Sequence, residues 1–212
     1  ISDPACPPDI KIKAAMAAGD AYMSRNEAGA TNRLADLEEA ASYFNYVLKN
    51  FPTNSQTPLA WGLLGNCYKE LGASDAKFYE RAADAYARVI NFPGVSTGTQ
   101  RKAMVGLGVL AEAKAENSGG DVQKGLLKEA FRNYLDAFTF ADLQEGDPDD
   151  LYWMQKAGME CARLAESFGQ WSKAVNIYTQ LQALPNLSPA FQSALEKRIS
   201  KAREHLASGK SD

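Results

Sequence analysis

Apolar side chains recur at helical spacing between residues 61 and 93. The first set stands at i, i+3, i+4, i+7 and i+10 and comprises Trp61, Leu64, Gly65, Tyr68 and Leu71. After a break that begins at Gly72, a second set has the same spacing and comprises Tyr79, Ala82, Ala83, Tyr86, Val89 and Ile90. This pattern predicts two successive helices, the second of which ends before Pro93.

The same pair of patterns occurs three more times. One upstream pair is formed by Ala15, Ala18, Gly19 and Tyr22, then Ala40, Phe44, Val47 and Pro52. Two downstream pairs are formed by Met104, Leu107, Gly108 and Ala111 with Ala130, Tyr134 and Ala137, and by Gly158, Cys161, Ala162, Ala165 and Phe168 with Ala174, Tyr178, Leu181 and Pro185. Because one short helix pair cannot bury both of its apolar stripes, the repetition predicts a stack of helix hairpins.

Turn and capping residues set the expected boundaries. We expect the other helices near residues 10–28, 34–50, 98–116, 121–141, 148–168 and 171–184. A capping residue stands directly before proline at Thr57, Asp147 and Ser188, which predicts three capped helix starts with proline in the first turn. We expect residues 1–9 to form a proline-rich lead-in, 10–207 one repeat domain and 208–212 a solvated tail.

A last amphipathic helix is predicted after Ser188. Its apolar side comprises Phe191, Ala194, Leu195, Ile199, Ala202 and Leu206. Its polar side comprises Gln192, Glu196, Lys197, Ser200, Lys201 and Arg203. A helix with a charged outer side is suited to cover the last apolar face of a stack, so this helix is predicted to be a cap.

These repeats resemble the tetratricopeptide repeat (TPR) family, whose pattern is a bulky residue, Leu-Gly and Tyr, then Ala, an aromatic residue, Ala and Pro. The match is formed by Trp61, Leu64, Gly65, Tyr68, Ala82, Tyr86 and Pro93, and the four copies together extend over roughly residues 11–188. The resemblance implies an all-α fold, an α-α superhelix (a TPR-like solenoid) of about four helix pairs with a C-terminal capping helix. Gly65 and Ala82 would then lie where two helices cross.

Three of the copies are longer than the family's repeat of about 34 residues. The extra residues lie at 23–34, 73–78 and 116–125, where they lengthen either helix ends or loops. Repeats with longer helices are most similar to those of bacterial cell-envelope proteins. This similarity implies a periplasmic or cell-envelope location, while a cytoplasmic location stays open.

Composition narrows the classes of partner. The 212 residues carry a formal net charge of -3 and no cluster of Lys and Arg, which argues against nucleic acid as the main partner. No apolar run approaches the roughly 18 residues of a membrane-spanning helix, so we expect no membrane insertion. The oligomeric state is not indicated by any of these patterns.

Residues suited to catalysis or metal binding are few. The only histidine, His205, stands near the end of the last helix, where a surface role is expected. Three cysteines have no metal-site spacing: Cys6, Cys67 and Cys161. The last two lie on or beside apolar stripes and are expected to be buried, whereas the first is expected to be a free thiol. Asp149 and Asp150 are interpreted as favourable charges at a helix N-terminus. We therefore expect no enzyme, no cofactor and no metal site.

The resemblance places the functional surface in a concave groove formed by the first helix of each pair. The positions that flank the apolar stripes there are Met16, Asp20, Met23, Leu59, Asn66, Lys69, Lys102, Val105, Val109, Met159 and Arg163. Their Met and Val side chains offer adaptable apolar contacts, and Lys69, Lys102 and Arg163 are suited to steer an acidic or polar segment. Alternatively, some of these residues only pack against neighbouring helices.

The resemblance therefore implies a non-enzymatic protein-protein interaction scaffold that binds a peptide or protein segment in its groove. A different class of function stays open. The chain is then the helical accessory domain of a larger enzyme or sensor whose active part lies outside these 212 residues.

Overall fold

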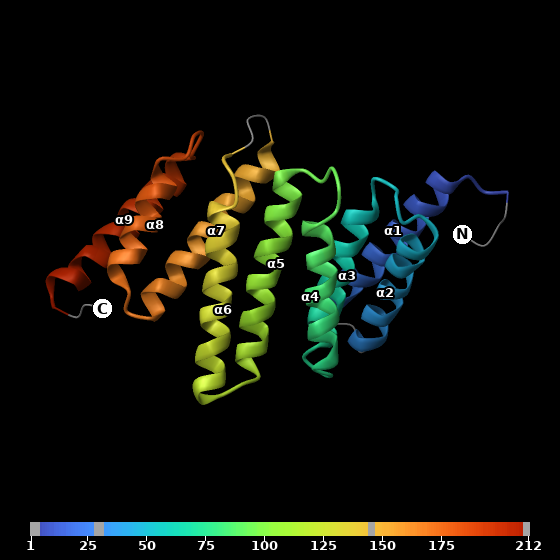
Figure 1. Cartoon of the computed structure of the whole chain (residues 1–212), viewed down its shortest axis with the longest axis horizontal. Helices are drawn as coiled ribbons and strands as arrows, with labels where there is room; N and C mark the ends of the chain where they lie inside the picture. Colours follow the sequence, from blue (N-terminus) through green and yellow to red (C-terminus); the bar gives the residue numbers. More distant parts are fainter. Residues whose placement is uncertain (1–4, 28–31, 144–146, 210–212) are drawn as a thin grey trace. The chain divides into compact units, whose positions relative to one another are not determined.

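The computed structural model describes residues 5–27, 32–143 and 147–209, and this part of the chain contains nine helices and no strand (Figure 1). The helices are α1 (Pro8–Glu27), α2 (Arg33–Asn50), α3 (Thr57–Leu71), α4 (Lys77–Ile90), α5 (Thr97–Glu116), α6 (Gly120–Thr139), α7 (Pro148–Ser167), α8 (Trp171–Gln182) and α9 (Pro189–Ala207). Every predicted helix is present, and its ends agree with the expected ones to within one helical turn. The predicted all-α fold is confirmed.

The helices group into two compact units. Unit 1 comprises Ile1–Ser96 with Glu116–Ser118, and unit 2 comprises Thr97–Ala115 with Gly119–Asp212. In unit 1, α2 packs against α1 and α3, and α3 also packs against α4. In unit 2, α7 packs against α6 and α8, and α8 also packs against α9. Consecutive helices in contact are the arrangement of a helical-repeat fold.

Each unit has its own apolar core, formed by the predicted stripes. In unit 1 the core includes the fully buried side chains of Phe44 and Leu64, and in unit 2 those of Tyr134, Tyr178 and Leu181. The expected burial of two cysteines is also confirmed, because Cys67 and Cys161 are both 0% exposed.

Two of the three predicted N-caps are confirmed. Asp147 Oδ1 accepts hydrogen bonds from the backbone N–H groups of Asp149 and Asp150 at 3.0 and 3.2 Å, and Ser188 Oγ accepts one from Phe191 at 3.2 Å. The cap at Thr57 is wrong. Thr57 is already the first residue of α3, and its hydroxyl donates backwards to the carbonyl of Phe51 at 2.7 Å.

The extra residues of the long repeats mostly extend helices at 116–125, whereas most of those at 73–78 form a turn. Of residues 116–125, only 117–119 lie between α5 and α6. Residues 73–76 form the turn before α4, which begins at Lys77. In the segment 23–34, α1 continues to Glu27 and α2 begins at Arg33, while residues 28–31 lie outside the described part.

Unit 2 contains a buried ion pair that the sequence did not predict. Arg101 on α5 and Asp150 in the first turn of α7 are both 0% exposed, and Arg101 Nε donates to Asp150 Oδ1 at 2.7 Å. The same guanidinium donates to the backbone carbonyls of Ala137 and Phe138 in the last turn of α6, and to that of Ala141 just after the helix. The last carbonyls of a helix have no intrahelical donor and a partial negative charge, so Arg101 satisfies them while it holds α5, α6 and α7 together.

Candidate binding surface on the first helices

Close helix crossings orient the first helices of the repeats. A Cβ added at Gly19 would lie 2.5 Å from the ring of Phe44. A Cβ added at Gly65 would lie 2.7 Å from the ring of Tyr86, and one added at Gly108 would lie 2.5 Å from the ring of Tyr134. Such distances are too short for a real carbon, so only glycine lets the aromatic ring of the second helix reach the backbone of the first. The predicted crossing at Gly65 is confirmed.

The tyrosines of the second helices also make hydrogen bonds to the first helices. The hydroxyl of Tyr86 donates to Asn66 Oδ1 at 2.7 Å, that of Tyr134 to Glu112 Oε2 at 3.2 Å, and that of Tyr178 to Glu166 Oε1 at 2.9 Å. Burial is the main cause that raises the pKa of all three tyrosines above the ordinary value, and nearby negative charge adds to it. These phenols therefore stay protonated and act as fixed donors that position polar side chains on the first helices.

The unit 1 residues proposed for the groove have different surroundings. Met16 is 8% exposed and belongs to the core, so its assignment to the groove is wrong. Met23 is half-buried against the same core, and Asn66 is held by Tyr86. Asp20 and Leu59 are exposed, the latter to 43%.

Lys69 is less available than the sequence indicates. Its ammonium lies 3.8 Å from Glu70 Oε1, and its side chain is 24% exposed. Glu70 is in turn paired with Arg33 of α2. Lys69 therefore faces a carboxylate of its own helix, and its charge is partly offset before a partner arrives.

The predicted apolar lining of unit 2 belongs mainly to its core. Val105 is 2% exposed, so its assignment to the groove is wrong. Val109 and Met159 are partly buried and pack against the same core cluster. Only the outer edges of Val109 and Met159 are left for a partner.

Arg163 is already paired on both sides. Its guanidinium donates to Glu112 of α5, and Nε donates to Glu160 Oε2 at 2.7 Å. Further along, Arg198 of α9 donates to Glu166 Oε2 at 3.3 Å. Together, these pairs connect α5, α7 and α9. Because Arg163 is already paired with Glu112 and Glu160, it does not offer a free positive charge to a partner.

A cation and two aromatic rings lie together on α5 and α7 in unit 2. Lys102 of α5 is exposed, and its Nζ lies 5.5 Å from the centre of the Trp153 ring of α7. Tyr152 is 55% exposed and meets the Trp153 ring edge-on, with ring centres 4.9 Å apart. We call Lys102, Tyr152 and Trp153 the aromatic surface. Of the three, only Lys102 was predicted from the sequence to lie on the binding surface.

The described residues include no metal cluster, and the single histidine of the chain packs against an aromatic ring. No group of three or more His, Cys, Asp or Glu side chains suited to a metal is present among them. His205 stacks on Trp171, with ring centres 3.9 Å apart and an angle of 6° between the planes. None of the helices within the described ranges is long and apolar enough to cross a bilayer.

The three thiols are expected to differ sharply in reactivity. Burial raises the pKa of Cys67 and Cys161 to about 12, whereas Cys6 lies partly exposed before α1. Since the thiolate is the reactive form, an aromatic disulfide reagent should modify only Cys6 in the folded protein and all three thiols after unfolding. Cys6→Ser should abolish the reaction of the folded protein. Rapid labelling of that variant in the native state would contradict the buried positions of the other two.

The assignment of this binding surface rests on the residues described above, because comparison with known proteins adds no further information. A scan against models of protein families found no match, and a search of curated proteins found no significant relative.

Proposed function

We propose that this protein is a non-enzymatic scaffold that binds a peptide or protein segment on the first helices of its repeats. The observation that supports it best is the aromatic surface of unit 2. Tyrosine, tryptophan and methionine are enriched at protein interfaces, and a tyrosine exposed to 55% is a suitable anchor for an apolar partner group. The resemblance to TPR proteins, which bind segments on the corresponding helices, supports the same function.

Charge around the aromatic surface indicates what kind of segment it would bind. Lys102 forms no ion pair with a carboxylate of the described residues, unlike Lys69 and Arg163. A partner carboxylate could therefore pair with Lys102 without breaking an ion pair inside the protein. We infer a segment with an aspartate or glutamate beside a large apolar or aromatic residue. The similarity to cell-envelope repeats favours a partner in the same compartment.

Selection from a phage-displayed library of random linear peptides tests this function. We expect enriched peptides to combine an acidic residue with a large apolar one and to bind with micromolar affinity, because transient interfaces bury less than about 1,200 Å². A selection that enriches no sequence, or only basic ones, would contradict the proposal.

The double variant Lys102→Glu, Tyr152→Ala should weaken binding of the selected peptides by at least about 30-fold, which corresponds to about 2 kcal/mol. The physical reason is the loss of both the anchoring ring and the positive charge. The matched control is Val122→Ala, Lys128→Glu, which changes an exposed apolar residue and an exposed lysine on α6. Fluorescence anisotropy gives the affinities, and equal binding by the two variants would place the peptide site elsewhere.

A further inference from the structure

Five exposed charged side chains of α9 make no ion pair with any described residue, namely Glu196, Lys197, Lys201, Arg203 and Glu204. Among them, Glu196 and Arg203 have opposite charges and line the same cavity, which Glu204 also lines. By contrast, Arg198 on the same helix is paired with Glu166. A capping helix is expected to have charged residues on its outer side, but it does not require two opposite charges seven residues apart.

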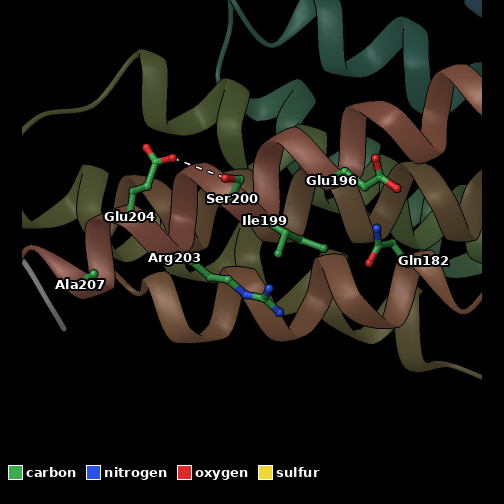
Figure 2. A pocket seen from close by; sticks show the side chains of 7 residues that line it. All are labelled: Gln182, Glu196, Ile199, Ser200, Arg203, Glu204 and Ala207. Atoms are coloured by element: carbon green, nitrogen blue, oxygen red, sulfur yellow. Dashed lines mark hydrogen bonds between the residues drawn. The ribbon is translucent and has the colours of Figure 1, made fainter.

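An open cavity of about 500 Å³ separates the two charges (Figure 2). Most of its lining comes from one side of α9, and Gln182 at the end of α8 completes it. Ile199, which is 6% exposed, forms an apolar floor, and Ser200 and Ala207 are small. The hydroxyl of Ser200 donates to Glu204 Oε1 at 3.4 Å, as the dashed line in Figure 2 shows. Small side chains along a helix let another helix approach closely.

The charges are arranged so that this side of α9 is complementary to itself. Glu196 and Arg203 are seven residues apart, which is about two helical turns, so they point in nearly the same direction about 10 Å apart. If a second α9 lies antiparallel across a twofold axis that passes between Ile199 and Ser200, each Glu196 meets the Arg203 of the other copy. Ile199 and Ser200 then face each other at the axis.

We propose that a second copy of this chain binds there, so that two α9 helices pair antiparallel in a symmetric dimer. In a twofold interface the same patch serves both partners, which requires such self-complementarity. An unrelated partner could bind through Glu196 or Arg203 alone, and it would require no fixed spacing between the two residues. The symmetric placement of Glu196 and Arg203 about the midpoint between Ile199 and Ser200 therefore favours a second copy. This inference is independent of the peptide site proposed on α5 and α7.

The expected dimer is weak and sensitive to salt. One helix side of this size buries less surface than the roughly 1,200 Å² of a standard stable interface, so a micromolar Kd is expected. Its two ion pairs lie at the edge of the contact, where they contribute mostly to specificity and are screened by salt.

Sedimentation velocity of the full 212-residue chain tests the dimer directly. From about 1 μM to about 500 μM protein at low salt, the average sedimentation coefficient should rise from that of a monomer towards that of a dimer. Added sodium chloride should shift the midpoint to higher concentration. A chain that stays monomeric over this whole range would overturn the proposal.

Charge reversal distinguishes this interface from any other. Glu196→Arg alone and Arg203→Glu alone should each raise the dimer Kd at least about tenfold, because like charges then meet twice. An equimolar mixture of these two variants should associate again as a heterodimer, since every contact is once more between opposite charges. The double variant Glu196→Arg, Arg203→Glu should likewise dimerise by itself.

The matched control is Lys201→Glu, which reverses an exposed charge about 140° around α9 from Glu196 and should leave the Kd unchanged. The three residues changed, Glu196, Arg203 and Lys201, are all exposed, so melting temperatures should be close to that of the unmodified protein. Dimerisation of Glu196→Arg with the unmodified Kd, or a mixture that does not associate, would overturn the inferred pairing.

Discussion

Arg101→Met is expected to destabilise the protein by about 3–5 kcal/mol, the largest effect we expect from any single charged residue. The substitution leaves the Asp150 carboxylate buried without its guanidinium, and it removes the donor from the carbonyls of Ala137, Phe138 and Ala141. Methionine fills much of the space of the arginine stem. The loss in free energy of unfolding therefore reflects the missing ion pair and hydrogen bonds more than a cavity. Urea unfolding followed by circular dichroism gives the free energy of unfolding.

A second substitution separates the ion pair from the contacts to α6. When Asp150→Asn is added to Arg101→Met, the double variant should lose less stability than the sum of the two single variants, by about 1–3 kcal/mol. The remaining loss then belongs to the carbonyls at the end of α6. Arg163→Met is the control, because it removes an arginine that is paired with carboxylates but is 46% exposed, and it should cost at most about 1 kcal/mol. Equal losses for Arg101→Met and Arg163→Met would contradict the burial of the first pair.

Helices were predictable from the sequence because their formation depends on residues close together in the chain. Apolar residues three and four apart marked the buried sides, and Asp147 and Ser188 marked two starts through side chains that reach only two or three residues ahead. The failure at Thr57 has a local cause. Its hydroxyl bonds a carbonyl six residues earlier, in a turn that a rule about the following residues does not cover.

Which side chains stay accessible was less predictable. Met16 and Val105 flank their apolar stripes by one helical position, and the neighbouring helices cover that flank. Spacing along one helix shows where a stripe lies, but its width depends on how the next helices cross it. The groove assignments therefore failed at positions where a small rotation of a helix decides between core and surface.

Pairing between distant charges was not predictable at all. Arg101 meets Asp150 across 49 residues of sequence, and Arg163 meets Glu112 across 51. A single sequence shows that these side chains are charged, yet not which opposite charge the fold brings to them. Among the three proposed steering cations, only Lys102 has no carboxylate partner in the described part of the structure. For this reason we propose the aromatic surface as the binding site.

One signal for that surface was present in the sequence. Tyr152 and Trp153 are adjacent in the first turns of a predicted helix, and adjacent helical residues point about 100° apart. If Trp153 packs on the core, as it does, then Tyr152 has to project away from it. An aromatic residue forced outwards in this way is a better indicator of an interface than an exposed aliphatic residue near a stripe.

Gly65→Leu is expected to destabilise the protein by about 3 kcal/mol through overpacking between α3 and α4. The first carbon added would lie 2.7 Å from Cε1 of Tyr86, and two further ring atoms lie at 3.0 and 3.1 Å. The ring has little freedom to move, because Tyr86 is 3% exposed and its hydroxyl is bonded to Asn66. Either the two helices separate or the hydrogen bond breaks. Urea unfolding measures the loss.

Alanine at two nearby glycines isolates the steric cause. Gly65→Ala and Gly62→Ala make the same change three residues apart in α3, and both replace glycine with the best helix former. No atom lies within 4 Å of the Cβ added at Gly62, so that variant should gain up to about 1 kcal/mol from helix propensity. Gly65→Ala should instead lose stability despite the same gain in propensity. If both alanines stabilised the protein equally, Tyr86 would not press against the backbone of α3, and the helix crossing would have to be placed elsewhere.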